Sequence, residues 1–294
     1  MVTPLGVGID WGSSNIRAWL LRKDGEAIAR NHISIGLREA RTRGFRQVLH
    51  ELLKPMPGAE ELPIIACGMV GARDGWSEVP YVSCPASSLT IMGAAQPVPD
   101  GRLKILPGVV QTHPSADVMR GEETQLIGIL AEQQSVTVCL PGTHSKWAYA
   151  EGGHLTGFRT YVTGDLFAAA RASSIFAAFA QEAPFDASSF RKGIDHACAT
   201  PLARALFQTR ARVATGGMRP DQAYWFLSGL LIGAELLCEI KEHPGSRVVL
   251  LADGALRDLY EFAFDALGRT VVCRSSEAAT RAGLALALRY WSGD

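Results

Sequence analysis

A pattern that occurs twice places the strongest constraint on the fold of this chain. An apolar run at residues 5–11 leads through a turn of glycine, serine and asparagine into a second apolar run at 16–21. A third run follows at 27–32, after an Asp-Gly pair. Short apolar runs joined by such turns are typical of antiparallel strands. We therefore predict that the chain begins as a three-stranded meander.

The same order recurs near the middle of the chain. Residues 136–140 form an apolar run, 141–145 a turn rich in glycine and hydroxyl side chains, and 146–150 a return strand. A Gly-Gly pair then precedes a third extended segment at 154–160. After each meander, extended segments alternate with helical ones, a pattern that predicts an α/β fold. Two such units in one chain predict two lobes, with a ligand cleft between them.

The chain is long enough to form two hydrophobic cores. It has 294 residues, of which 47% are hydrophobic, and single cores stop growing at roughly this length. We expect an N-terminal lobe at residues 1–133 and a C-terminal lobe at 134–294. Apolar residues at helical spacing predict helices at 41–54, 118–131, 164–181, 190–208, 220–243, 257–267 and 277–291.

Charge and cysteine content narrow the classes of function. The 29 basic and 29 acidic residues balance, so we expect neither a nucleic acid nor a membrane as partner. The six cysteines include no C-x-x-C pair, which favours free thiols in a reducing compartment. The most apolar helical window, residues 224–240, is interrupted by Glu235. We therefore predict a cytoplasmic protein.

The turn after Asp10 has the composition of a phosphate-binding loop. It consists of Gly12, Ser13, Ser14 and Asn15. Backbone N–H groups and serine hydroxyls in such a turn form a concavity for phosphate oxygens. Asp10, at the end of the first strand, is placed to hold a hydrated cation beside them. Taken alone, the same residues also suit an ordinary hairpin turn.

Two further segments point to chemistry. The glycine-rich loop at residues 68–76 ends at Trp76 and is a favourable place for a small substrate. A helix start at residues 121–125 carries two adjacent acids, Glu122 and Glu123. Acids at this position also stabilise a helix through its dipole, so their presence does not by itself require catalysis.

With both turns in view, the chain resembles the sugar-kinase, Hsp70 and actin superfamily, whose members clamp ATP between two ribonuclease-H-like lobes. This resemblance implies a duplicated actin-like ATPase fold of class α/β with an inter-lobe cleft, and ATP and Mg2+ as cofactors. The similar motifs occur in order along the chain, as the first phosphate loop at 10–17, the connecting helix with the catalytic acid at 121–128, the second phosphate loop at 140–145 and the adenosine-binding segment at 252–256.

Within this superfamily the chain is similar to the 2-dehydro-3-deoxygalactonokinase family. That resemblance implies phosphorylation of 2-dehydro-3-deoxy-D-galactonate at its 6-hydroxyl by ATP, a step in galactonate catabolism. The partners would be this sugar acid and ATP; the sequence leaves open the galacto or gluco epimer and assembly into a homo-oligomer. The similar blocks are residues 9–12, 68–71, 118–126, 141–147 and 226–235.

The resemblance assigns the catalytic roles. Glu122 would be the general base that accepts the proton of the 6-hydroxyl, with Glu123 and Asp165 as rivals. Carbohydrate kinases often have Asp where Glu122 stands, which leaves the reach of this base open. The second loop has Leu140-Pro141 where many superfamily members carry an acid. Asp10 is therefore the expected metal ligand.

Binding roles follow from the same motifs. The sugar acid needs a partner for its carboxylate, and the fork of an arginine matches that group best; Arg73 is open as a further candidate. The expected substrate-binding residues are Met69, Val70, Trp76, Arg120 and Arg159. The expected nucleotide-binding residues are Asp10, Gly12, Ser13, Ser14, Asn15, Arg17, Gly142, Thr143, His144, Gly254 and Ala255.

Three other functions remain open at this point. A kinase of a related sugar acid, a phosphohydrolase or ATPase with water as acceptor, and a non-catalytic nucleotide-dependent binding module would share the same scaffold. The loop at residues 68–76 and the arginines favour a bound organic acceptor. Release of ADP with and without the sugar acid separates these functions.

Overall fold

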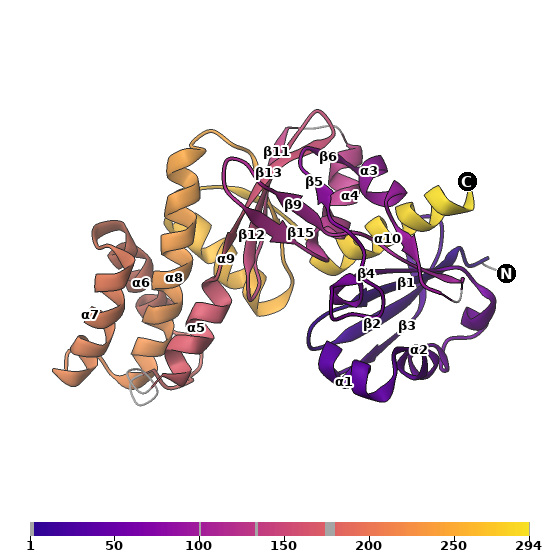
Figure 1. Cartoon of the computed structure of the whole chain (residues 1–294). Coiled ribbons are helices and arrows are strands. Elements are labelled where there is room, and N and C mark those ends of the chain that lie inside the picture. The colour runs from indigo at the N-terminus through magenta and orange to yellow at the C-terminus, as the bar shows by residue number, and fades with distance from the viewer. Residues whose placement is uncertain (1–2, 100, 133–134, 174–179, 294) are drawn as a thin grey trace. The chain divides into compact units, whose positions relative to one another are not determined.

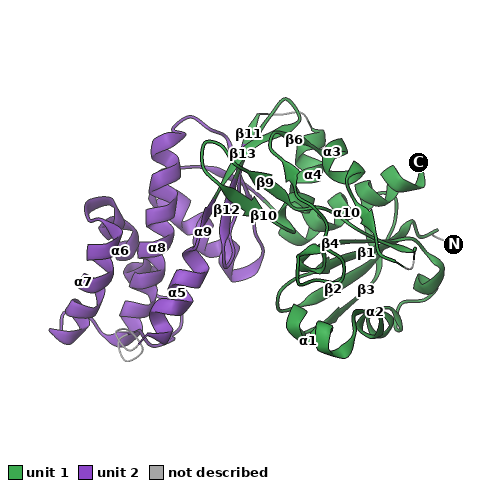
Figure 2. Cartoon of the chain, viewed as in Figure 1, with its two compact units in different colours: residues 1–136, 148–159, 274–294 green, residues 137–147, 160–273 purple. Residues whose placement is uncertain are grey.

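The computed structural model describes residues 3–99, 101–132, 135–173 and 180–293. These residues form two compact units, which Figure 2 shows in different colours. The first unit extends beyond the expected N-terminal lobe because it also contains a piece from the middle of the chain and the C-terminal segment. The first unit comprises Met1–Val136, Ala148–Arg159 and Arg274–Asp294, and the second comprises Thr137–Trp147 and Thr160–Cys273.

The predicted opening meander is confirmed in the first unit, where β1, β2 and β3 lie beside β4 (Figure 1). These strands belong to a six-stranded sheet of order β3-β2-β1-β4-β8-β7. The three meander strands pair antiparallel, whereas β4 pairs parallel to β1 and β8 parallel to β4. The strands are β1 (Gly6–Trp11), β2 (Ile16–Leu21), β3 (Ala27–Ile33), β4 (Ile64–Gly68), β7 (Gln96–Pro97) and β8 (Leu103–Ile105).

Helices cover this sheet and bury its apolar side chains. Helices α1 (Leu37–Arg43) and α2 (Phe45–Leu53) replace the single helix expected at 41–54, because Gly44 between them has φ +92°. That conformation is open to glycine and interrupts a regular helix. Helix α10 (Ser276–Ser292) packs on β1. Glycine is needed at position 8, because a Cβ there would lie 3.0 Å from Leu284 of this helix. A short helix, η1 (Ala59–Glu61), precedes β4.

A small sheet of order β10-β9-β5 corrects the expectation of a helix from residue 118. Strand β10 (Asp117–Met119) pairs with β9 (Val109–Gln111), and Gly121 then has φ +114°. Helix α4 (Glu122–Ala131) therefore begins at Glu122. The same unit also contains η2 (Met69–Gly71), β5 (Val82–Ser83), β6 (Ala86–Ser87) and α3 (Ser88–Gly93).

The second meander is also confirmed and repeats the topology of the first. The order β15-β14-β11-β12-β13 matches β8-β4-β1-β2-β3, and β14 pairs parallel to β11 as β4 does to β1. The fold is therefore a duplicated α/β fold. Strands β12 and β13 belong partly to each unit, and β6 extends the sheet beside β13. The strands are β11 (Val136–Leu140), β12 (Ser145–Glu151), β13 (His154–Tyr161), β14 (Val248–Leu251) and β15 (Val271–Arg274).

Helix α8 forms the centre of the helical part of the second unit. It packs closely on α6, since a Cβ at Gly229 would lie 2.0 Å from the carbonyl oxygen of Phe190. Pro201 separates α6 from α7, so the single helix expected at 190–208 is wrong. The helices are α5 (Thr163–Ala172), α6 (Ala187–Ala199), α7 (Leu202–Ala214), α8 (Pro220–Glu242) and α9 (Gly254–Ala266); part of the expected helix at 164–181 lies outside the described residues.

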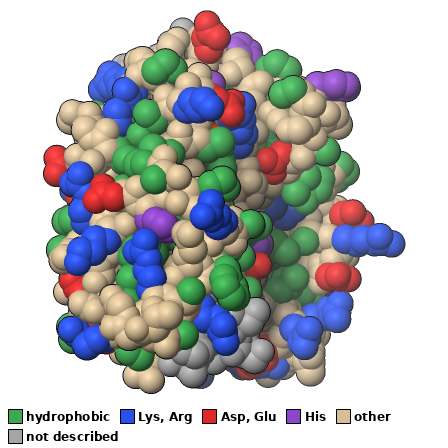
Figure 3. All heavy atoms as spheres, turned by 90° about the vertical axis from the view of Figure 1, so that its left-hand side faces the viewer, with side chains coloured by type: hydrophobic (Ala, Val, Ile, Leu, Met, Phe, Trp, Pro, Cys, Tyr) green, Lys and Arg blue, Asp and Glu red, His purple; other side chains and the backbone are tan. Residues whose placement is uncertain are grey.

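By length and composition α8 could cross a membrane, with a mean hydropathy of 1.4 in its most apolar window. The core helix of a soluble domain has the same properties, and 61% of this window is buried. Its close contact with α6 favours a core helix. On the face drawn in Figure 3, basic and acidic side chains are interspersed, in keeping with the balanced charge of the sequence.

Candidate active site

The turn between β1 and β2 presents its side chains to solvent. The N–H of Gly12 donates to the carbonyl oxygen of Asn15 at 2.9 Å, which closes the turn. Ser13, Ser14 and Asn15 are exposed. The carbonyl oxygen of Ser13 accepts from the N–H of Leu37 at 3.2 Å, so the start of α1 supports the turn. The loop is thus fixed by its backbone while its hydroxyl and amide groups are accessible to a ligand.

Asp10 lies beside this turn at the end of β1. In the sheet register it stands opposite Arg17 on one side and Cys67 on the other. The Arg17 guanidinium is 3.9 Å from its carboxylate. Burial raises the pKa of Asp10, Arg17 lowers it and the charge of Glu122 raises it. Asp10 and Glu122 therefore repel each other across the end of the sheet.

Glu122 reaches this position because of two glycines. Gly121 has φ +114°, and a Cβ there would lie 3.4 Å from the Cα of Gly68, at the end of β4. The start of α4 thus approaches the sheet edge that carries Asp10. The Glu122 carboxylate accepts from the backbone N–H of Arg120 at 3.1 Å and is partly exposed.

Carboxylates are the donors that a hard divalent cation prefers, and the charge of Glu122 acts on Asp10. A cation between Asp10 and Glu122 would relieve their repulsion, so these residues fit the Mg2+ that the superfamily implies. Within the described part of the chain, no group of three or more His, Cys, Asp or Glu side chains could hold a metal ion.

Glu123 differs from Glu122 in its burial. It is fully buried, and both carboxylate oxygens accept from the N–H of Gly121, at 2.9 and 2.7 Å. Burial raises the pKa of Glu123 to about 8, and the charge of Glu122 adds to the shift. Glu123 is therefore mostly protonated at neutral pH and is a poor base there. Asp165, the other rival, lies in the second unit near His144, at 3.8 Å.

The glycine-rich loop at residues 68–76 turns much of its surface inward. Val70 is fully buried in the core of the first unit, and Met69 is half-buried. The Trp76 ring stacks on Phe45 with centroids 5.8 Å apart and meets Trp11 edge-on. Trp76 also lines a cavity of about 430 Å³ next to α2. Any contact of Val70 with a substrate would have to come from its backbone.

Arg120, directly after β10, has unused hydrogen-bonding capacity. Its Nη2 donates to the carbonyl oxygen of Val79 at 2.9 Å, and its guanidinium lies 4.2 Å from the ring centroid of Tyr81. Its buried Nε and Nη1 atoms have no hydrogen-bond partner within the described residues. A Cβ at Gly71 would lie 3.0 Å from Nη1, so the loop closes over this group. Arg159, on β13, lies over the ring of Tyr149 at 5.8 Å.

The second loop is supported by the start of α5. A Cβ at Gly164 would lie 2.6 Å from the carbonyl oxygen of Gly142, so glycine is required for this approach. The N–H of Asp165 donates to the carbonyl oxygen of Thr143 at 2.9 Å. Thr143 and His144 are exposed. As in the first turn, the backbone is fixed and the side chains are accessible.

A cavity of about 340 Å³ in the second unit brings together two of the predicted nucleotide-binding residues, Gly142 and Ala255. Gly254, with φ +56°, begins the helix that carries Ala255. The walls are mainly apolar and aromatic, as in most ligand pockets. The other lining residues are Thr163, Gly164, Phe167, Tyr224, Trp225, Ser228, Leu231, Ile232, Leu256, Leu259 and Tyr260.

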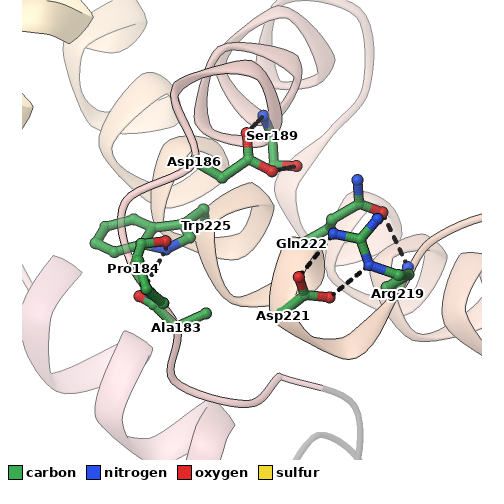
Figure 4. Close-up of polar contacts among 8 residues, drawn as sticks. All are labelled: Ala183, Pro184, Asp186, Ser189, Arg219, Asp221, Gln222 and Trp225. Atoms are coloured by element: carbon green, nitrogen blue, oxygen red, sulfur yellow. Dashed lines mark hydrogen bonds and ion pairs between the residues drawn. The ribbon is translucent and has the colours of Figure 1, made fainter.

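The aromatic wall of this cavity is held in place by polar contacts. The indole N–H of Trp225 donates to the carbonyl oxygens of Ala183 and Pro184, at 3.0 and 2.8 Å (Figure 4). Figure 4 also shows the Arg219 guanidinium paired with Asp221 at the start of the same helix. The Trp225 contacts tie α8 to the segment before α6, whereas the pair of Arg219 and Asp221 lies within the start of α8.

Sequence reasoning missed Tyr81 and the aromatic wall. Tyr81 follows an ordinary Val-Pro pair, and nothing in the sequence links it to Arg120. Tyr224 and Trp225 lie in a helix whose apolar residues indicate core packing. One signal in the sequence could have indicated the wall, namely two adjacent large aromatic residues near the beginning of that helix.

Comparison with known proteins relates the chain to one family. The family model described as 2-keto-3-deoxy-galactonokinase matches residues 10–287. A probable 2-dehydro-3-deoxygalactonokinase of Rhizobium meliloti (strain 1021) is 37% identical over 96% of this chain and 95% of its own length. The 2-dehydro-3-deoxygalactonokinase of Escherichia coli (strain K12) is 34% identical, with 95% of each chain covered.

Solved structures agree with this relationship. A crystal structure of a Sinorhizobium meliloti protein with the same assignment has a TM-score of 0.90 and 37% identity, covering 97% of this chain and 98% of that one. The ADPNP-bound activator of 2-hydroxyisocaproyl-CoA dehydratase from Clostridium difficile shares the fold, at a TM-score of 0.54, 12% identity and coverage of 98% and 96%. By its motifs, its repeated sheet topology and its near full-length matches, the chain belongs to the 2-keto-3-deoxy-galactonokinase family.

Proposed function

We propose that this chain is an ATP-dependent kinase that phosphorylates the 6-hydroxyl of 2-dehydro-3-deoxy-D-galactonate. The proposal rests on family membership and, in the structure, on the approach of Glu122 to Asp10 beside the first phosphate-binding turn. A base, a cation ligand and phosphate-binding groups are the parts that phosphoryl transfer requires. All three lie in the first unit.

Glu122 acts as the general base in this proposal. Its carboxylate is partly exposed, whereas Glu123 is buried and mostly protonated at neutral pH. The N–H of Arg120 orients the Glu122 carboxylate, at 3.1 Å. Glu122 accepts the proton of the 6-hydroxyl as this oxygen attacks the γ-phosphorus of ATP, and ADP leaves with the electron pair of the broken bond.

Asp10 would hold Mg2+ through its water shell, beside Glu122. When bound, Mg2+ neutralises charge on the β and γ phosphates. The hydroxyls of Ser13 and Ser14 and the N–H groups of the turn donate to phosphate oxygens, while Arg17 supplies a fixed positive charge. Arg17 stands 3.9 Å from Asp10 and lowers the pKa of that carboxylate, which partly opposes the larger rise caused by burial.

Arg120 binds the carboxylate of the sugar acid. Its Nε and Nη1 atoms are buried and lack partners, and such donors are costly unless a ligand satisfies them. The Tyr81 ring and the carbonyl of Val79 hold the guanidinium in one orientation. Arg159 is a second candidate for this carboxylate, and Met69, Val70 and Trp76 shape the loop over the acceptor.

The adenosine of ATP occupies the 340 Å³ cavity of the second unit. Its aromatic and apolar walls suit a purine, and Ser228 supplies a hydroxyl within them. Gly142 borders this cavity, which supports a role for the second loop, with Thr143 and His144, in binding the phosphates. Gly254 and Ala255 shape the mouth of the cavity at the start of α9.

The cellular setting follows from the substrates. Both ATP and a catabolic sugar acid are small soluble molecules, so we place the reaction in the cytoplasm, without a nucleic acid or membrane partner. The presence of free cysteines, two of them fully buried, suits a reducing compartment.

A coupled assay of ADP release over a panel of 2-keto-3-deoxy acids and aldonates tests the function. Strong stimulation by 2-dehydro-3-deoxygalactonate, with 6-phosphorylated product, is the expected result. Stimulation by another sugar acid alone would change the substrate, and ADP release without any acceptor would indicate a phosphohydrolase. ATP binding without turnover under any condition would leave a binding module.

A further inference from the structure

A buried carboxylate in the second unit joins segments that are far apart in the sequence. Glu235, on α8, is only 2% exposed. Its Oε1 accepts hydrogen bonds from Ser145 Oγ at 2.7 Å and Trp147 Nε1 at 2.8 Å. Its Oε2 accepts from Thr163 Oγ1 at 2.5 Å and from the Tyr260 hydroxyl at 2.9 Å. Four donors from three different segments thus converge on one side chain.

Each of these segments carries part of the nucleotide cavity. Ser145 ends the second phosphate-binding loop. Thr163 precedes Gly164, whose backbone lies against the carbonyl of Gly142 in that loop. Tyr260 lies on α9, the helix that begins at the predicted adenosine segment, and both Thr163 and Tyr260 line the cavity. Glu235 itself does not line it.

The direction of these hydrogen bonds has a chemical consequence. An ionised carboxylate can accept all four, whereas a protonated one would lose part of its acceptor capacity. The hydroxyl groups of Ser145 and Thr163 each have one proton, and each donates it in a hydrogen bond to Glu235. Their oxygens can therefore only accept from other groups, so they cannot donate to phosphate. Phosphate oxygens at this loop are therefore left to the backbone N–H groups and to the exposed side chains of Thr143 and His144. The positions of these groups then depend on Glu235.

We propose that Glu235 is a positioning residue that holds the second phosphate-binding loop and α9 in the geometry required for ATP binding. The inference deepens the proposed function and rests on it, since ATP is the nucleotide. Loss of this role would loosen the second phosphate-binding loop and α9 in particular, whereas a general loss of stability would not be confined to these two segments.

The chain offers a matched control on the same helix. Glu239 is 1% exposed and accepts a hydrogen bond from Tyr161 at 2.6 Å, one turn after Glu235. Glu235→Gln and Glu239→Gln are the same chemical change at similar burial, but Glu235 accepts from Ser145 of the loop, whereas Glu239 accepts from Tyr161. Tyr260→Phe, which deletes one donor and keeps the ring, serves as a milder variant should Glu235→Gln fail to fold.

Hydrogen exchange of the nucleotide-free variants and titration with ATP test the proposal together. Glu235→Gln should speed exchange in residues 137–147 and 254–266 and weaken ATP binding by at least about tenfold, the effect of one lost charged hydrogen bond. Tyr260→Phe should act in the same direction, and Glu239→Gln should do neither.

Unchanged exchange in both segments, equal effects of the two Glu variants, or faster exchange with unchanged ATP affinity would overturn the proposal. If Glu235→Gln sped exchange in both segments but the wild-type protein did not bind ATP, the proposed function would be overturned instead.

Discussion

Gly283 of α10 packs directly on the backbone of Thr124 in α4. A Cβ at Gly283 would lie 1.9 Å from the carbonyl oxygen of Thr124, far inside van der Waals contact. Thr124 follows Glu122 and Glu123 in the first turn of α4. The C-terminal helix therefore sets the position of the helix start that carries the proposed base.

Gly283→Ala should move α4 or unfold it partially. Overpacking of this kind costs about 1–3 kcal/mol of unfolding free energy, and urea denaturation measures it. Gly128→Ala, in α4, is the control, since a Cβ at Gly128 would meet nothing within 4 Å. That change should be neutral or stabilise by up to about 1 kcal/mol. Equal stability of the two variants would show that the two helices adjust freely.

Glu122→Gln should abolish most turnover while ATP binding persists. A positioned base contributes about 10²–10⁴ in rate, so kcat should fall by that factor. Glu123→Gln is the matched control, because Glu123 is already mostly protonated at neutral pH. It should keep kcat within about threefold, since it alters no transition-state charge. The reverse pattern would transfer the role of base to Glu123.

Arg120→Lys should impair use of the acid specifically. Lysine keeps the charge but loses the fork and the contact with Tyr81, so kcat/KM for the sugar acid should fall by about 10–100-fold. For a substrate analogue with a carboxamide in place of the carboxylate, the loss should be small. Arg73 is an exposed residue of the neighbouring loop, and Arg73→Lys should leave kcat/KM unchanged for both substrates. An equal loss with both substrates would remove the proposed contact with the carboxylate.

The sequence predicted the topology well because the repeat is local. Each meander consists of adjacent strands and short turns, so the turn residues and apolar runs are enough to identify it. Helix ends were less predictable. Residues 117–119 became a strand because they pair with β9, which in turn pairs with the more distant strand β5. Gly44 and Pro201 divided helices that apolar periodicity joined.

Within the candidate site, residues in ordered motifs were predictable and their partners were not. Asp10 and Glu122 approach each other through Gly68 and Gly121, an approach that depends on tertiary packing. The contacts of Arg120 with Tyr81 and of Glu235 with four donors involve segments that no local pattern links. Buried polar networks of this kind are specified by the whole fold rather than by any one segment.

Glu123 should make stability depend on pH. Its pKa is about 8 in the folded protein against an ordinary value of 4.5, so the folded state binds more protons between these values. The free energy of unfolding therefore falls as pH rises from 4.5 to 8. Urea denaturation at pH 5.5 and 8.5 should show a larger decrease for wild type than for Glu123→Gln, by roughly one to several kcal/mol. Equal decreases would mean that Glu123 ionises in the folded state without cost.

Ala255→Phe should block the cavity of the second unit without disturbing its core. Ala255 is exposed in the first turn of α9 and lines the cavity mouth, so a phenyl group there would occupy space proposed for adenosine. The KM for ATP should rise by at least about tenfold, whereas the KM for the sugar acid should stay unchanged. Ala278→Phe is the matched control, an exposed alanine in the first turn of α10, and should alter neither. Because inorganic tripolyphosphate has no base, its binding should also be insensitive to Ala255→Phe. If ATP affinity survived this change, adenosine would have to bind elsewhere in the protein.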